Sequence, residues 1–332
     1  MKTGSRWVTL GLKIAVSAGL IALAFWQVDR AELSGAFTDW RVDPLVVALV
    51  LFVISNLFGA FQWGLLLKGQ EISKGWKDLV RIYLVGVFLN NFMVGNLAGD
   101  VVRVYDVRQM SGRGAEALVA TVMDRFLGLF AMMFLAGVGC LIVFIAKPDG
   151  HPPLTPLAPV VAAVYGSFAV LGVLLTSRRA GGFVDRLLIW ALPESVSEAV
   201  ANVRSALNVY RTAPRVLFLA TLISLGVQFL RIVVHFACGL AVGLNVSLLW
   251  FVLFIPLISV VAMLPISVGG LGPRENAAIR LFGTVAAPAA PVIVMELLAH
   301  LVTLLSSLPG GIAFVLGRRK PIQAVESERD HD

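Results

Sequence analysis

The chain has 332 residues, of which 58% are hydrophobic and only 14% are charged, and its mean hydropathy is +0.87. This composition, with several apolar runs of about 18 residues or more, excludes a water-soluble globular protein and is typical of a polytopic membrane protein. The net charge of +7 does not indicate nucleic-acid binding, because the basic residues gather where the positive-inside rule places them in a membrane protein.

The expected fold is an all-α polytopic membrane protein with about eight hydrophobic segments. The first, Trp7 to Trp26, is long enough to span a bilayer and is interpreted as a retained helix, not as a cleaved signal peptide. The others are expected at residues 44–67, 79–97, 117–146, 156–176, 216–244, 248–268 and 287–317.

Clusters of Lys and Arg indicate which loops stay in the cytoplasm, because translocating these residues across the membrane is disfavoured. The clusters lie at residues 2–6, 68–81, 178–215 and 318–320, and the intervening loops carry only Arg30, Arg41 and Lys147. Both termini are therefore predicted to be cytoplasmic.

This loop assignment leaves two segments that must enter and leave the membrane on one face. Residues 82–114 begin and end inside, whereas residues 248–286 begin and end outside, so each is interpreted as a re-entrant or broken hairpin. The first contains GNLAGDVVRVY and the second VGGLGPRENAA, and each motif places an arginine, Arg103 or Arg274, shortly after a glycine. Matching motifs in oppositely facing hairpins predict an inverted repeat, for which the alternative is coincidence.

The predicted organisation is a single transmembrane domain over residues 1–317. Its first half covers about 1–176 and its second half about 216–317. The intervening segment 178–215 mixes apolar and basic residues at helical spacing, which indicates helices lying on the cytoplasmic membrane surface; an ordinary cytoplasmic linker is the alternative. Residues 318–332 are predicted to form a disordered cytoplasmic tail.

The glycine-rich turns of both motifs predict an anion-binding site. The glycines concerned are Gly99, Gly269, Gly270 and Gly272. A helix that begins directly after such a turn directs the positive end of its dipole and its unpaired N–H groups at the turn. Arg103 and Arg274 are expected on the first turn of these helices, where a phosphate or carboxylate would offset their repulsion from the dipole. Asp100 and Glu275 are assigned to the same site; alternatively, they only neutralise the arginines in buried ion pairs.

Further polar side chains lie within the predicted spans, where a charge costs a few kcal/mol and should face the protein interior. They are Asp124 and Arg125 in one segment, Gln228, Arg231 and His235 in another, and Glu296, His300, Thr303 and Ser307 in the last. As a set they predict a polar pathway or proton coupling, although a structural role is the commoner one for a single histidine. No cofactor or metal ion is expected, because phosphate-binding loops, paired Cys/His clusters and nucleophile motifs are missing from the sequence.

The runs NNFMVGNLAGDVVRVYDVRQ, TVMDRFLGL, LPISVGGLGPRENAAI and LPGG resemble the lysylphosphatidylglycerol synthase transmembrane family, also called flippase-like integral membrane proteins. The first motif of that family resembles P-x-x-x-G-G-D-x-x-R. Val94 and Ala98 depart from it here, while Gly99, Asp100 and Arg103 match. The second motif keeps its residues at Pro265, Gly269, Gly270, Gly272, Arg274 and Glu275.

The resemblance implies lipid handling in a bacterial cytoplasmic membrane, with a membrane lipid as ligand and a separate lipid-modifying enzyme as a candidate partner. Because the chain ends at Asp332, without room for a soluble aminoacyl-transferase domain, we expect a stand-alone translocator and no enzyme activity. The leading hypothesis is a flippase-like transporter of an anionic, aminoacylated or glycosylated lipid, whose headgroup Arg103 and Arg274 hold near the midplane. The alternatives are an integral-membrane transferase that uses Asp100 and Asp124, and a non-transporting partner of a lipid-biosynthesis enzyme.

Overall fold

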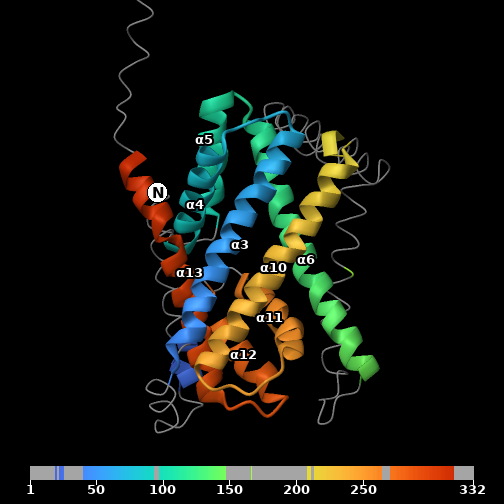
Figure 1. Cartoon of the computed structure of the whole chain (residues 1–332), viewed down its shortest axis with the longest axis vertical. Coiled ribbons are helices and arrows are strands. Elements are labelled where there is room, and N and C mark those ends of the chain that lie inside the picture. Colours follow the sequence, from blue (N-terminus) through green and yellow to red (C-terminus); the bar gives the residue numbers. More distant parts are fainter. Residues whose placement is uncertain are drawn as a thin grey trace, which may run out of the picture.

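The computed structural model of the chain describes residues 19–20, 22–25, 40–92, 97–146, 166, 208–210, 213–263 and 270–317, and these residues form helices and short connections without a β-strand. The bundle consists of α3 (Val42–Gly69), α4 (Trp76–Phe92), α5 (Ala98–Ser111), α6 (Gly114–Ala146), α10 (Pro214–Ala241), α11 (Leu248–Met263), α12 (Pro273–Gly283) and α13 (Ala289–Gly317) (Figure 1). The expected all-α fold is confirmed. The predicted tail, and most of segments 7–26, 156–176 and 178–215, lie outside the described residues.

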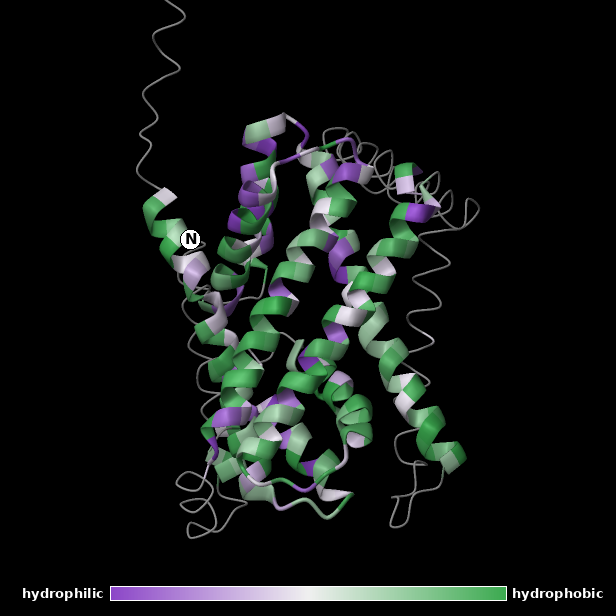
Figure 2. Cartoon of the chain, in the orientation of Figure 1, coloured by the Kyte–Doolittle hydropathy of each residue, from purple (hydrophilic) through white to green (hydrophobic). Residues whose placement is uncertain are grey.

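Four of these helices, α3, α6, α10 and α13, are long and apolar enough to cross a membrane, with lengths of 28, 33, 28 and 29 residues. At 1.5 Å per residue, the shortest of them spans about 42 Å, more than the hydrocarbon core of about 30 Å. They are hydrophobic over most of their length, and the hydrophilic stretches lie mainly on α5 and within the bundle (Figure 2). The chain is therefore a multi-pass integral membrane protein.

The described helices fall into two sets of four with a matching order along the chain. Helices α10 and α11 begin 172 residues after α3 and α4, respectively (214 minus 42 and 248 minus 76). Helices α12 and α13 begin 175 residues after α5 and α6 (273 minus 98 and 289 minus 114). The packing repeats as well: α4 packs against α5 and α13, as α11 packs against α12 and α6, while the related helices α3 and α10 pack against each other.

The two sets are inverted relative to each other. At one end the backbone N–H of Arg41, just before α3, donates to the carbonyl of Ala241, the last residue of α10, at 2.8 Å. At the other end the hydroxyl of Tyr210, just before α10, donates to the carbonyl of Leu66 near the end of α3, at 2.9 Å. Helices α3 and α10 are therefore antiparallel, and the pairs α4/α5 and α11/α12 lie toward opposite ends of the bundle (Figure 1). This arrangement agrees with the predicted inverted repeat; re-entry of each hairpin into a membrane stays a prediction.

Glycines position the hairpins against the long helices. A Cβ atom added to Gly310 of α13 would overlap the backbone carbonyl of Leu84 in α4, and one added to Gly99 of α5 would overlap the carbonyl of Gly86. Small residues at such crossings let helix backbones approach closely, as is common in membranes. Gly272, with φ of 93°, makes the turn into α12 in a conformation that side chains disfavour. Because these contacts fix α5 and α12, they also fix the charged side chains that both helices carry.

Candidate functional site

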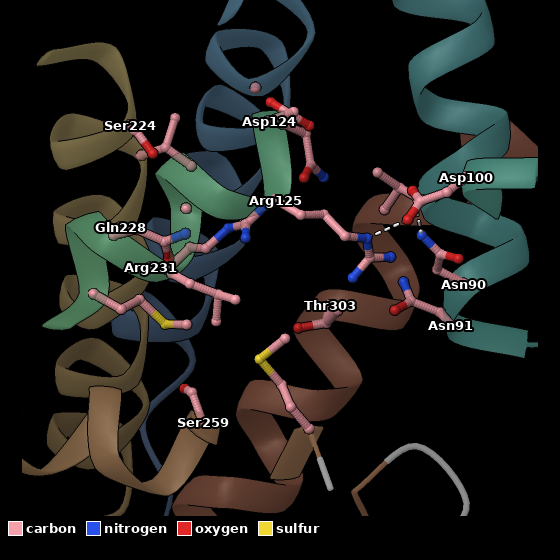
Figure 3. Close-up of a pocket in the computed structure, with 18 of the residues that line it drawn as sticks. Asn90, Asn91, Asp100, Asp124, Arg125, Ser224, Gln228, Arg231, Ser259 and Thr303 are labelled. Atoms are coloured by element: carbon pink, nitrogen blue, oxygen red, sulfur yellow. Dashed lines mark hydrogen bonds and ion pairs between the residues drawn. The ribbon is translucent and has the colours of Figure 1, made fainter. Parts of the chain in front are cut away.

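A partly open cavity of about 660 Å³ lies between the two sets of helices. Its wall carries four arginines, Arg103, Arg125, Arg231 and Arg274, together with several amide and hydroxyl side chains. Figure 3 shows that Arg231 and Gln228 approach the cavity from α10, opposite Asn90, Asn91 and Asp100. A polar cavity inside helices that are otherwise hydrophobic is the strongest candidate for a functional site, because polar groups within a bilayer are expensive to keep.

Arg103 is held by two carboxylates and two aromatic rings. Its guanidinium lies 3.1 Å from an Asp124 oxygen and 3.5 Å from an Asp100 oxygen, and 4.3 and 4.6 Å from the ring centres of Trp63 and Tyr83. The residue is only 5% exposed. Ion pairs and cation–π contacts thus engage most of the guanidinium and attach α5 to α3, α4 and α6.

The two carboxylates are also bound by other side chains. Asp124 accepts a hydrogen bond from the amide of Gln62 at 3.0 Å. Asp100 pairs with the guanidinium of Arg125 and lies 3.4 Å from the amide nitrogen of Asn90, whose oxygen accepts the backbone N–H of Gly99 at 2.8 Å. Arg103, Arg125 and the two aspartates therefore form a network with no net formal charge.

Arg274 has an equivalent environment in the second half. Its guanidinium lies 3.1 Å from Glu275 and 3.1 Å from Glu296, a residue of α13 that is fully buried. Glu275 also accepts the backbone N–H of Gly272 at 2.6 Å, and His235 lies 3.9 Å from Glu296. In both halves, therefore, an arginine of the short helix binds one carboxylate on its own helix and one on the following long helix.

The structure brings most of the predicted site residues together, although not as the motif match suggested. Arg274 is the second residue of α12, on its first turn as expected, but Arg103 is the sixth residue of α5 and lies on the second turn. The acidic residues are the equivalent pair, since Asp100 and Glu275 are each the third residue of their helix. Matching the two arginines by their distance from a glycine therefore aligns α5 with α12 about one helical turn out of register.

The remaining predicted residues divide into three groups. Arg125, Arg231 and His300 line the cavity. His235 and Glu296 pair with each other beside Arg274. Gly270 and Gly272 form the turn before α12 with positive φ, whereas Gly269 lies outside the described residues. Both motif arginines are thus in buried ion pairs, which was the alternative to a headgroup site; their role as ligands stays a prediction.

The cavity wall follows the twofold relation of the helices. Asn56 of α3 and Gln228 of α10 both line it, and their separation in sequence (228 minus 56) equals the offset between the starts of these two helices. Arg125 of α6 and His300 of α13 line it as well, and their separation (300 minus 125) equals the offset between α6 and α13. The cavity therefore lies at the junction of the two inverted halves, where repeat-built transporters bind their substrates.

Several lining residues escaped the sequence analysis. The amides of Asn56, Gln62, Asn90 and Asn91 all contribute to the cavity. The sequence could have indicated them, because an uncharged amide inside a hydrophobic segment is costly to bury unless it finds a hydrogen-bond partner. Uncharged amides are less conspicuous in a hydrophobic span than charged residues, which is why these four were not predicted.

Comparison with known proteins agrees with this architecture. Residues 10–310 match the model of the family described as the lysylphosphatidylglycerol synthase TM region. A UPF0104 membrane protein of Methanothermobacter thermautotrophicus is 27% identical over 284 residues, covering 79% of this chain and 82% of the relative. A second one from the same organism is 20% identical over 291 residues (82% of this chain and 83% of the relative), and one of Pyrococcus horikoshii is 26% identical over 125 residues (37% of each). With its inverted helix sets and its motif residues grouped around one cavity, the chain belongs to the lysylphosphatidylglycerol synthase transmembrane-region family.

Proposed function

We propose that the protein is a flippase-like transporter that moves a lipid with an anionic headgroup between the leaflets of a bacterial cytoplasmic membrane, with both of its own termini in the cytoplasm. The observation that carries this proposal is the polar, arginine-lined cavity of about 660 Å³ between two inverted helix sets. Aminoacylated and glycosylated phospholipids fall within the same substrate class. A separate enzyme that modifies the lipid is the natural partner.

The physical problem in lipid translocation is the passage of a polar headgroup through hydrocarbon. Transfer of an unpaired charge or hydrogen-bonding group into an apolar medium costs many kcal/mol. Arginine, amide and hydroxyl groups along a partly open cavity replace water around the headgroup while the acyl chains stay in the bilayer. Inverted repeats support alternating access, because the two related halves can exchange which side of the cavity is open.

Arg103 and Arg274 take part in this proposal through their ion pairs. A headgroup phosphate that displaces one carboxylate from each arginine would meet a charge already positioned by aromatic and acidic neighbours. The same ion pairs keep the short helices α5 and α12 attached to α6 and α13 between transport cycles. Proton coupling would involve Asp124, Glu275, Glu296 or the neighbouring histidines.

The transferase alternative is less well supported. It would use Asp100 and Asp124 as catalytic carboxylates, yet both are paired with arginines. These ion pairs occupy the carboxylate oxygens that a general base would have to present to its substrate. We therefore propose transport without enzymatic conversion of the lipid.

The test is a reconstitution of the purified protein into vesicles that contain a fluorescent phospholipid in both leaflets. Dithionite added outside destroys the outer-leaflet signal at once and reaches inner-leaflet lipid only as that lipid is translocated. Protein-containing vesicles should lose nearly all the fluorescence of labelled phosphatidylglycerol, while protein-free vesicles should lose about half. Equal loss in the two preparations, with intact folded protein, would rule out the transport proposal for this lipid class.

A further inference from the structure

The four cavity arginines are not equivalent in their partners. Arg103 and Arg125 share Asp100 and Asp124, and Arg274 pairs with two glutamates. The guanidinium of Arg231 alone among them makes no ion pair within 4 Å and no hydrogen bond with the part of the chain that the structure describes. Its guanidinium carbon lies 5.7 Å from the ring centre of Phe52, and the guanidinium interacts with Asp124 only through longer-range electrostatics. The Nε atom of Arg231 is buried with no hydrogen-bond partner among the described residues, as are those of Arg103 and Arg274, so the missing ion pair is what distinguishes Arg231.

The depth of Arg231 makes this isolation expensive. It lies well inside α10 (Pro214–Ala241), about 26 Å from the start and about 15 Å from the end of the helix along its axis. A charge at this position is near the middle of a membrane-spanning helix, where an uncompensated cation costs at least a few kcal/mol. A residue of this kind is retained when something else supplies the negative charge.

Other unpaired polar atoms indicate what the ligand contains. The amide nitrogen of Asn91, a hydrogen-bond donor, and the amide oxygen of Asn56, an acceptor, are buried with no hydrogen-bond partner in the described ranges of the chain and belong to residues that line the same cavity. A buried donor or acceptor left unpaired costs about 1–3 kcal/mol. The cavity therefore offers a cation and a donor to an oxygen-rich anion, and an acceptor to a hydroxyl or ammonium group.

From these groups we infer that Arg231 is the primary phosphate-binding residue of the cavity and that its ligand is the singly charged phosphodiester of a lipid headgroup. The planar guanidinium binds the two unesterified oxygens of a phosphodiester through two parallel hydrogen bonds. Asn56 and Asn91 then contact the hydroxyl- or ammonium-bearing part of the headgroup. This inference rests on the proposed function, because it names the chemical group that the transporter holds.

The test measures binding, which can be separated from transport. The full chain in detergent micelles is titrated with fluorescent phosphatidylglycerol and with fluorescent diacylglycerol, which has no phosphate. Arg231→Gln is compared with Arg231→Lys and with Arg215→Gln, a matched charge removal at an exposed position of the same helix. Thermal unfolding of each variant is recorded in parallel.

Arg231→Gln should weaken phosphatidylglycerol binding at least about tenfold, since a charged hydrogen bond is lost, and should leave diacylglycerol binding unchanged. Arg231→Lys should retain part of the affinity, and Arg215→Gln should bind as tightly as the wild type. The melting temperature of Arg231→Gln should not fall, because no protein ion pair is broken. A fall in melting temperature would indicate a structural role and overturn the assignment.

The lipid source of the phosphate is tested with inorganic phosphate as competitor. Millimolar phosphate should not displace phosphatidylglycerol, because the acyl chains contribute to lipid binding. Tighter binding of inorganic phosphate than of the lipid would overturn the lipid assignment, and so would unaltered lipid binding by Arg231→Gln. Binding that depends on Arg231 without any translocation in vesicles would refute the transport proposal and leave this site intact.

Discussion

Replacement of Arg103 by Gln should destabilise the protein because it removes one cationic partner from each of two buried carboxylates, Asp124 and Asp100. Breaking a buried ion pair by removing one member costs about 3–5 kcal/mol, and each cation–π contact, to Trp63 and to Tyr83, contributes about 0.5–2 kcal/mol. Asp100 keeps Arg125, and Asp124 keeps Gln62, so the lower part of the combined range applies. We expect the free energy of unfolding to fall by about 4 kcal/mol.

A double-mutant cycle with Asp124→Asn tests the cause of that loss. Asp124→Asn alone should cost less than Arg103→Gln, and the double variant should be more stable than the sum of the two losses predicts, with a coupling energy of about 2 kcal/mol. The measurement is equilibrium unfolding in mixed micelles with increasing sodium dodecyl sulfate. Additive effects, or an Arg103→Gln variant as stable as the wild type, would refute the view that Arg103 attaches α5 to α6.

Two further outcomes follow from the packing and the charge distribution. Gly310→Ala should lower the melting temperature by several degrees, because the added Cβ would overlap the backbone of Leu84. Gly226→Ala is the control and should leave the melting temperature unchanged, because the space around its Cβ is open. Equal effects of the two substitutions would contradict the close crossing of α4 and α13. A green fluorescent protein fused after Asp332 should fluoresce and an alkaline phosphatase fused there should be inactive, and the opposite pair of results would contradict a cytoplasmic C-terminus.

The sequence predicted the features that depend on hydropathy and local spacing. Long apolar segments became α3, α6, α10 and α13, because a chain in hydrocarbon must satisfy its backbone hydrogen bonds internally. The two segments that the count of basic loops singled out overlap the short helices α4/α5 and α11/α12, and their re-entry into the membrane stays a prediction. The polar residues inside these spans were correctly expected to face the interior in the case of Arg125, Arg231 and His300.

The partners of each charge were beyond the sequence, because they depend on how helices pack. Asp124 pairs with Arg103 and Glu296 with Arg274, and in both cases a helix end and a turn separate the two partners along the chain. Because both arginines follow a glycine at the same spacing in their motifs, the sequence predicted Arg103 and Arg274 as the residues that bind an anion. The packing instead gives each of them two carboxylates and gives Arg231 no ion pair with any residue that the structure describes; no motif describes the surroundings of Arg231.

The twofold relation explains why a single unpaired cation is significant. An exact repeat would place every lining residue twice, so Arg231 of α10 would have a second arginine at the equivalent position of α3. The offset between these helices makes that position Gly59 (231 minus 59 equals 214 minus 42), and a Cβ there would overlap the hydroxyl of Tyr83. The first half thus uses this position to pack Tyr83, which in turn contacts Arg103.

Departure from symmetry gives the cavity an arginine at this position in only one of its halves. The neighbouring equivalent pair, Asn56 and Gln228, keeps an amide in both halves, so the polar character of the wall is shared while the cation is not. Two unpaired arginines facing each other would repel and would require a dianion to bind between them. An arginine in a cavity that amide side chains also line suits a phosphodiester with neutral or cationic substituents. Because the carboxylates of Arg103 and Arg274 compete with the headgroup for those two arginines, the headgroup can also be released.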